Sequence, residues 1–182
     1  MINVCVFGDS VAKGVVFDEE KKKYIFLGDN FLKLVQERQP VKFRNFAKFG
    51  CTVTKGSLIM SKQRNVLSDY DYTILEFGGN DCDFDWNSVS ESPFDAHRPN
   101  ITMDIFRNTY KSMIESVIAA GSTPILLTLP PLDSNRFFGW ISKGLDGGNI
   151  MSFLNNDVET IYNWHKIYNN YQIGRASCRE RV

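Results

Sequence analysis

Three short segments of the chain contain the residue types that acyl-transfer chemistry requires. Gly8-Asp9-Ser10 follows one apolar run, Gly50 lies just beyond a second, and Gly78-Gly79-Asn80-Asp81 follows a third. A serine at the end of a buried strand is well placed as a nucleophile, and an asparagine amide can donate to a developing oxyanion. A glycine offers an unhindered backbone N–H for the same purpose. Ser10, Gly50 and Asn80 therefore predict a serine nucleophile with an oxyanion hole.

Each segment also has a purely structural interpretation. Ser10 suits the N-cap of a following helix, and Gly50 suits an ordinary turn. Asn80 and Asp81 are typical of an Asx turn, in which the side chain bonds its own backbone. These interpretations explain the segments one at a time, whereas an acyl-transfer site also explains why all three follow strands.

Strand and helix patterns alternate along the chain and specify how the segments are positioned. Short runs rich in apolar residues predict strands at 2–7, 72–77 and 124–129, and residues 41–46 are a further strand candidate. Periodic apolar positions predict helices from 31 to just before Pro40, over 54–66, from Asn100 to Gly121, and within 150–171. This alternation predicts one α/β domain, a three-layer flavodoxin-like sandwich around a central parallel sheet. Ligands of such sheets bind beyond the carboxyl ends of the strands, where the three segments and the loop at 130–133 lie.

The three segments resemble the sequence blocks of SGNH (GDSL-type) hydrolases, a family of esterases and lipases. Gly8-Asp9-Ser10 resembles the nucleophile block, with Val11 in place of the usual leucine. The stretch 45–50 is similar to the second block, with Ala47 at the position of its middle glycine. Gly78-Gly79-Asn80-Asp81 matches the third block. The resemblance covers most of residues 1–135.

This resemblance implies an SGNH-hydrolase fold and an ester hydrolase that uses no cofactor or metal. Ser10 would attack the ester carbonyl, while the backbone N–H groups of Ser10 and Gly50 and the Asn80 amide hold the oxyanion. The neighbouring residues Asp9, Gly79 and Asp81 are expected to contact the substrate. The substrate itself is expected to be a small-molecule or carbohydrate ester.

The family's fourth element, an Asp-x-x-His pair, does not occur in this sequence. His97 follows Asp95 at a spacing one residue too short, and Tyr162 stands three residues before His165. We therefore expect His97 on a polar loop and His165 on the surface or packing edge of a helix. Loss of a triad member costs up to about 10⁶ in turnover, so we expect the chain to be nearly inactive.

Residues 173–182 resemble the translated sequence of a sequencing adapter and are interpreted as a non-native tail. The native part is then an SGNH-like domain at 1–172 that lacks its last strand and helix. An unpaired fourth strand at the sheet edge would favour aggregation, so low solubility or marginal stability is expected.

Composition and charge narrow the alternatives. The 182 residues carry 21 Lys and Arg against 21 Asp and Glu, a balance that argues against a nucleic-acid partner. The sequence has neither a run of roughly 18 apolar residues nor a secretory signal, so a cytoplasmic protein without a membrane span is expected. Four scattered cysteines predict reduced packing residues. No Gly-rich phosphate cradle is present.

Two further features have competing interpretations. Asp81, Asp83 and Asp85 alternate like the start of a calcium loop, but Trp86 and Ser92 occupy the positions of its glycine and glutamate, so an acidic, solvated loop is expected. Aromatic residues in the loops after the third and fourth strands either pack the loops down or line an acyl or sugar site; they are Phe84, Trp86, Phe94, Phe137, Phe138 and Trp140.

Two other classes of protein remain as alternatives to an esterase. A non-catalytic module that binds an acyl or sugar ligand would use the same cleft. A flavodoxin-like nucleotide or flavin binder would share the architecture but leaves Gly78-Gly79-Asn80-Asp81 without a role. The sequence leaves the particular ester and the oligomeric state open.

Overall fold

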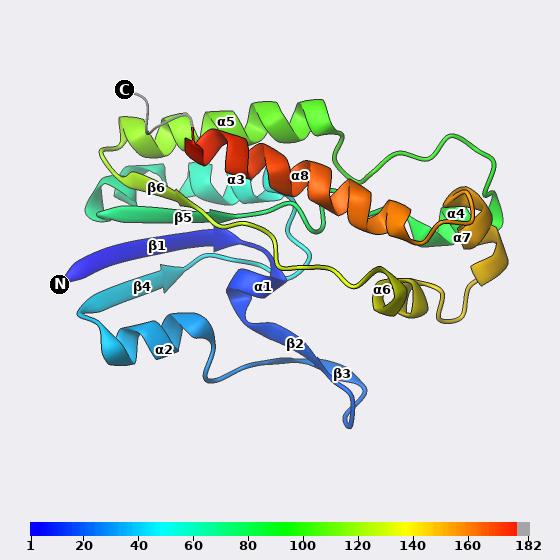
Figure 1. Ribbon diagram of the computed structural model, residues 1–182. Helices are drawn as coiled ribbons and strands as arrows, with labels where there is room; N and C mark the ends of the chain where they lie inside the picture. The colour runs from blue at the N-terminus through cyan, green and yellow to red at the C-terminus, as the bar shows by residue number, and fades with distance from the viewer. Residues whose placement is uncertain (178–182) are drawn as a thin grey trace.

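Four parallel strands form the central sheet of the computed structural model, which describes the backbone of residues 1–177 and the side chains of residues 1–171 (Figure 1). β1 (Ile2–Gly8) pairs with β4 (Val41–Asn45) on one side and with β5 (Tyr72–Glu76) on the other. β6 (Thr123–Leu126) pairs with β5, so the strand order is β4-β1-β5-β6. The predicted strands are confirmed, although β6 ends three residues early because the Leu129 N–H donates to the Asn169 side chain (2.9 Å).

Helices cover both faces of the sheet, and a second group of helices lies beyond the carboxyl ends of its strands (Figure 1). They are α1 (Ser10–Lys13), α2 (Phe31–Arg38), α3 (Val53–Lys62), the 3-10 helix η1 (Arg64–Asp69), α4 (Trp86–Glu91), α5 (Met103–Ala119), α6 (Ser134–Ile141), α7 (Gly147–Phe153) and α8 (Glu159–Ser177). The start of α2 follows from its sequence, because the Asn30 side chain accepts the N–H groups of Leu32 and Lys33 (3.1 and 3.2 Å).

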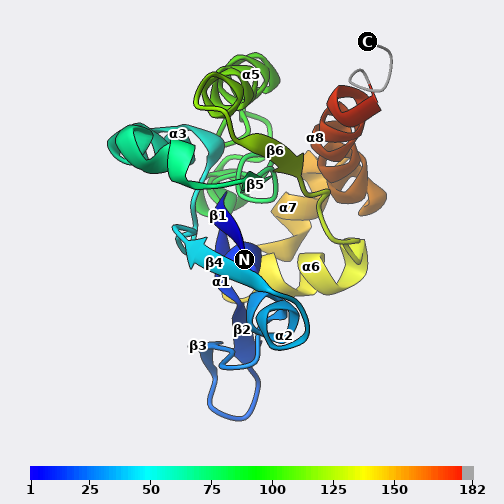
Figure 2. The same cartoon turned by 90° about the vertical axis from the view of Figure 1, so that its left-hand side faces the viewer.

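The side chains of β1 alternate between two cores, as the two-residue period of a strand requires. Cys5 and Phe7 point into the core that α3 and α5 cover, while Val4 and Val6 point to the face that α2 covers. α8 runs beside β6, the edge strand of the described sheet (Figure 2). The three-layer α/β architecture is therefore confirmed. None of the described helices is long and apolar enough to cross a membrane.

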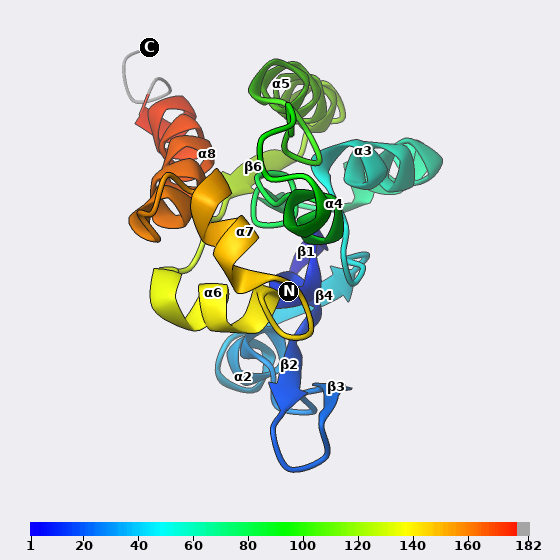
Figure 3. The ribbon, with the colours of Figure 1, turned by 90° about the vertical axis from the view of Figure 1, so that its right-hand side faces the viewer.

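A third core lies beyond the sheet and joins α4, α6, α7 and the first turn of α8 (Figure 3). Its buried members are Trp86, Val89, Ile141, Ile150, Leu154 and Ile161. Neither α4, of six residues, nor α6, of eight, is predicted from the sequence, where their aromatic residues are interpreted as parts of loops.

The antiparallel hairpin of β2 (Val15–Asp18) and β3 (Lys23–Phe26) is also absent from the sequence prediction. Its turn is built by Asp18, whose Oδ1 accepts the N–H groups of Glu20 and Lys21 (3.0 and 2.9 Å). The hairpin contacts α6 through Phe17 and Trp140, and both elements line one groove.

Two helix boundaries differ from the prediction. α5 begins at Met103 with Thr102 as its N-cap, because Asn100 instead donates its side-chain N–H to the Asn80 carbonyl (3.0 Å). The region 150–171 contains two helices, separated where Asn155 and Asn156 take positive φ angles of 55° and 58°.

The expected boundary after Gln172 stays a prediction. Helix α8 continues through residue 177, and residues 178–182 of the tail, including Cys178, lie outside the described residues. The remaining cysteines, Cys5, Cys51 and Cys82, are buried free thiols.

Candidate active site

Ser10 lies where β1 turns directly into α1. A Cβ on Gly8 would come within 2.7 Å of the Ala12 Cβ, so only glycine allows α1 to begin so close to the strand. Asp9 is the N-cap of α1, and its Oδ1 accepts the Val11 N–H (2.8 Å). Ser10 is therefore the first helical residue and not the cap. Its hydroxyl makes no hydrogen bond within the described part of the chain.

The Asn80 amide joins the three segments that the sequence singled out. Its Nδ2 donates to Asp9 Oδ2 (2.9 Å) and, more weakly, to the Cys51 carbonyl (3.4 Å). The side chain thus bonds other segments, and the Asx-turn interpretation is wrong for Asn80. Because Asp9 fixes the orientation of the amide, the second and longer N–H contact is the one an incoming oxyanion can replace.

Gly50 lies beside Asn80 but does not line the Ser10 cavity. It takes a φ of 64°, and an added Cβ would meet no atom within 4 Å. Its backbone N–H donates no hydrogen bond within residues 1–177. The carbonyl of the next residue, Cys51, is the one that accepts from Asn80. Gly50 is therefore a free donor on the adjoining loop.

A cavity of about 220 Å³ contains Ser10 in its wall. Asp9, Gly79 and Asn80 also line it, as their predicted roles require. Apolar side chains form much of the remaining wall; they are Val11, Trp86, Leu129, Leu132, Phe137, Ile161 and Trp164. Asp81 is placed differently from the expectation, because it is fully buried and its Oδ1 accepts the Val53 N–H at the start of α3 (2.8 Å). The structure therefore gives Asp81 a contact with α3 and no place in the cavity wall.

Glu76, at the end of β5, is a buried carboxyl that the sequence analysis did not single out. Its Oε2 accepts the N–H groups of Asp9 (3.2 Å) and Ala12 (3.3 Å), and its Oε1 has no partner among the described residues. Burial, followed by the negative charge of Asp9, raises the pKa of Glu76 to about 8. Burial also raises the pKa of Asp9. At neutral pH, Glu76 is therefore protonated beside the Asp9 carboxylate.

The other aspartates of the loop after β5 have partners within the protein. Burial raises the pKa of Asp81 to about 7. Asp83 accepts the Trp86 indole N–H (2.7 Å), and Asp85 is the N-cap of α4. Asp83 is thus a half-buried residue that positions Trp86, and of the three aspartates only Asp85 is exposed as a solvated loop requires. No group of three metal-ligating side chains occurs within the described residues.

His165 lies on α8 as expected and on its packing side, the second of the two expected positions, since only 7% of it is exposed. The sequence did not indicate that it lines the same cavity as Ser10. Burial lowers the pKa of His165, so the imidazole is neutral at pH 7. No carboxylate bonds it within the side chains described. Only the tertiary structure reveals that His165 lines the cavity, because α8 packs against α6 beyond the ends of the strands.

His97 occupies the loop that the sequence predicted. Its Nε2 lies 2.7 Å from the Ser92 carbonyl, and its ring packs edge-to-face on Phe153 (5.2 Å between centroids). This contact belongs to the α4–α7 region, and His97 does not line the Ser10 cavity.

Comparisons with known proteins bear on the fold. No family model and no curated protein matches the sequence. Solved structures do match. A lipase/acylhydrolase from Enterococcus faecalis has 21% identity and a TM-score of 0.52, with 93% of this chain and 73% of that chain covered. A lipase from a goat rumen metagenome has 14% identity and a TM-score of 0.57, with 94% and 74% covered.

An aryl esterase from M. smegmatis is similar to the same extent, with 15% identity, a TM-score of 0.55, and coverage of 92% of this chain and 80% of that chain. Identities this low are informative about the fold alone. The expected SGNH-hydrolase fold is confirmed, and the chain shares the α/β architecture of these lipases and esterases.

Proposed function

We propose that the protein is a serine hydrolase of carboxylic esters, with Ser10 as its nucleophile. The observation that carries this proposal is the unengaged Ser10 hydroxyl in a largely apolar cavity, next to an oriented Asn80 amide. A nucleophile and an oxyanion donor facing one small cavity are the elements of acyl transfer. The fold of known lipases and esterases agrees with this chemistry.

In the proposed reaction, Ser10 Oγ attacks the ester carbonyl carbon and the carbonyl oxygen becomes an oxyanion. The Ser10 N–H, at the first position of α1, has no acceptor within its own helix and donates to that oxyanion together with Asn80. The Gly50 N–H, the third donor that the family resemblance implies, is free of other bonds within the described residues but lies outside the residues that line this cavity. The tetrahedral intermediate then expels the alcohol, which takes up the proton that Ser10 released. Water cleaves the acylated Ser10, releasing the acid and returning a proton to the serine.

The hydroxyl proton of Ser10 needs a base to accept it. The base available in the cavity is His165, which is neutral but lacks, within the described side chains, the carboxylate that would orient it. Loss of the orienting carboxylate lowers turnover by about 10⁴ in a serine protease. We therefore expect slow hydrolysis by this chain, about 10³–10⁴ above the rate in water.

Labelling of Ser10 tests the proposal directly. A fluorophosphonate probe should modify the protein at Ser10, as located by peptide mass spectrometry, and Ser10→Ala should abolish the labelling. Hydrolysis of nitrophenyl acetate should be slow and should disappear in the same variant. Labelling elsewhere, or hydrolysis that survives Ser10→Ala, would count against the nucleophile assignment.

A non-catalytic binding module is the second candidate, because His165 lacks a carboxylate partner among the described residues. The two candidates differ in one measurement. A binding module would retain a small ester in the cavity without forming an acyl or phosphonyl adduct on Ser10, whereas the hydrolase forms the adduct.

A further inference from the structure

A second cavity of the described chain lies outside the Ser10 site. It is a groove of about 760 Å³ between the β2–β3 hairpin and α6. The mechanism proposed above uses none of its residues as reacting groups. A volume of this size is within the range of small-molecule binding sites, about 300–1,000 Å³.

Aromatic side chains from both walls meet in this groove. Phe17 and Tyr24 are a cross-strand pair of the hairpin with ring centroids 5.4 Å apart. Trp140 of α6 contacts both, at 4.7 Å from Phe17 and 6.2 Å from Tyr24. These contacts do not bury the rings, because 50% of Tyr24 and 38% of Trp140 stay exposed. The groove therefore presents accessible aromatic surface to a ligand.

Charged side chains surround the aromatic residues. Glu19 of the hairpin turn and Arg136 of α6 face each other across the groove at 3.5 Å. The Lys143 ammonium lies 4.6 Å from the Trp140 ring centroid, and Lys22 and Asp133 complete the lining. Five charged groups around exposed rings provide hydrogen-bond partners for a polar ligand that also has an apolar face.

The groove adjoins the Ser10 cavity, because Pro131, Leu132 and Phe137 line both. An ester whose carbonyl lies at Ser10 would extend one end into each space. The Ser10 cavity of about 220 Å³ suits a short acyl group, while the groove of about 760 Å³ accepts a larger one.

We propose that the groove between the hairpin and α6 binds the alcohol part of the substrate, and that this alcohol is a polyhydroxylated ring such as a sugar. The inference rests on the proposed ester hydrolysis and assigns Tyr24 and Trp140 as specificity-determining residues. Their rings would contact the apolar face of the sugar, and Lys22, Arg136 and Lys143 would donate hydrogen bonds to its oxygens, whether these are free or acetylated. A short acyl group, such as acetyl, would occupy the cavity beside Ser10.

A fatty acyl chain is the competing occupant of the groove. It would bury the aromatic surface, but it would also desolvate Glu19, Lys22, Asp133, Arg136 and Lys143 without offering any of them a hydrogen bond. A polyhydroxylated ring has no such cost. The charges around the groove therefore favour the sugar.

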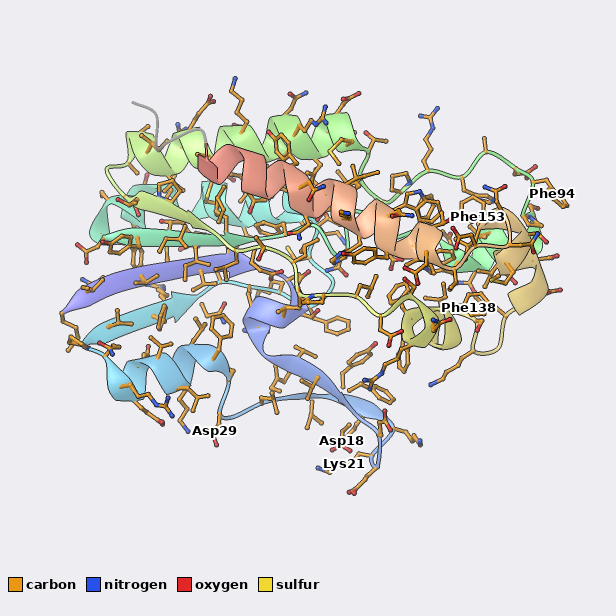
Figure 4. All side chains as sticks on the ribbon, viewed as in Figure 1. Asp18, Lys21, Asp29, Phe94, Phe138 and Phe153 are labelled. Carbon is orange, nitrogen blue, oxygen red and sulfur yellow. The ribbon has the colours of Figure 1, made fainter. Side chains whose placement is uncertain are left out.

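Two acetyl esters test the assignment because they differ only in the alcohol. Hydrolysis of xylose tetraacetate and of ethyl acetate is compared in the parent protein, Tyr24→Ala and Trp140→Ala. Each substitution should raise KM for xylose tetraacetate about tenfold, equivalent to about 1.4 kcal/mol, and leave kcat and the ethyl acetate kinetics within about twofold. Phe94→Ala is the matched control, because Phe94 is 89% exposed and lies far from the hairpin tip marked by Asp18 and Lys21 (Figure 4).

A second measurement does not depend on turnover. In the Ser10→Ala background, saturation-transfer NMR gives the dissociation constant of xylose tetraacetate, and Tyr24→Ala should raise that constant about tenfold. A thermal melt of each variant shows whether the substitution has disturbed the fold. If Trp140→Ala is destabilised, Tyr24→Ala alone provides the test.

The possible results separate this inference from the proposed function. If neither substitution changes KM for xylose tetraacetate, the groove assignment is refuted and the proposed hydrolase activity is unaffected. Binding that depends on Tyr24, without any hydrolysis by the parent, supports the groove and refutes the hydrolase. If the substitutions raise KM for ethyl octanoate instead, the groove holds the acyl chain and the inference is wrong. Absence of both binding and hydrolysis also overturns it.

Discussion

Replacement of Glu76 by glutamine should make the protein more stable at alkaline pH. In the folded protein, Glu76 is 2% exposed and its pKa is raised from 4.5 to about 8, first by burial and then by the Asp9 charge. Between these values, the folded state holds a proton that the unfolded state has lost. The free energy of unfolding contributed by Glu76 therefore falls as the pH rises from 4.5 to about 8, and is constant above it.

The size of the effect follows from the same two pKa values. Each pKa unit between the folded and unfolded states corresponds to about 1.4 kcal/mol, so Glu76 lowers the free energy of unfolding by on the order of 3–5 kcal/mol once the pH exceeds about 8. Glutamine keeps an oxygen that can accept the Asp9 and Ala12 N–H groups and removes the ionisation. Glu76→Gln should therefore match the parent near pH 4 and exceed it by a few kcal/mol at pH 9.

Urea unfolding followed by circular dichroism, at several values between pH 4 and pH 9, measures this difference. The parent curve includes Asp81, whose pKa is also raised, to about 7, and which lowers stability over the same range. Because Asp81 is present in both proteins, the difference between the curves isolates Glu76 and its coupling to Asp9. Glu91→Gln, at an exposed position on α4, is the matched control and should follow the parent at every pH.

Parallel stability curves for the parent and Glu76→Gln would refute the reasoning. Such a result would mean that Glu76 is ionised in the folded protein at neutral pH. Two adjacent buried carboxylates would then need a charge partner that the described contacts do not contain. A lower stability of Glu76→Gln at pH 9 would contradict the prediction equally.

The other predictions concern the oxyanion donor, the cavity histidine and one packing contact. Asn80→Ala should slow fluorophosphonate labelling of Ser10 by about 10²–10³, as loss of an oxyanion donor does, and unchanged labelling would remove Asn80 from the site. His165→Phe should change the labelling rate by less than about tenfold, because the imidazole lacks a carboxylate partner within the described residues; a thousandfold loss would instead identify His165 as the base. Gly56→Ala should destabilise the protein by about 1–3 kcal/mol in urea unfolding, since its Cβ would come within 2.2 Å of the buried Phe77 ring, whereas Gly139→Ala, which meets no atom within 4 Å, should not.

Local sequence was sufficient for the sheet and for the residues of the proposed oxyanion hole. Three strands of the sheet come from runs rich in apolar residues, and β4 alternates apolar and polar residues. Glycines follow the first and the third predicted strands directly, so these strands and their ends are encoded locally. Parallel strands bring their carboxyl ends to one edge. The contact between Asp9 and Asn80, 71 residues apart, follows from that edge.

Local sequence was insufficient for the elements around that edge. The β2–β3 hairpin, α4 and α6 are short elements. Their aromatic residues contact distant elements, and the hydrophobic periodicity within one segment cannot predict such contacts. Trp140, for example, contacts Phe17 at a separation of more than a hundred residues. These contacts decide where the groove lies.

The sequence by itself determined the type of sheet and the identity of the proposed nucleophile and oxyanion donors, because apolar runs and glycine turns act over a few residues. Only the tertiary structure decided that Glu76 is protonated beside Asp9 and that His165 lines the Ser10 cavity. Burial is the physical reason in both cases. A side chain loses its water, and its pKa shifts, only once distant elements pack around it.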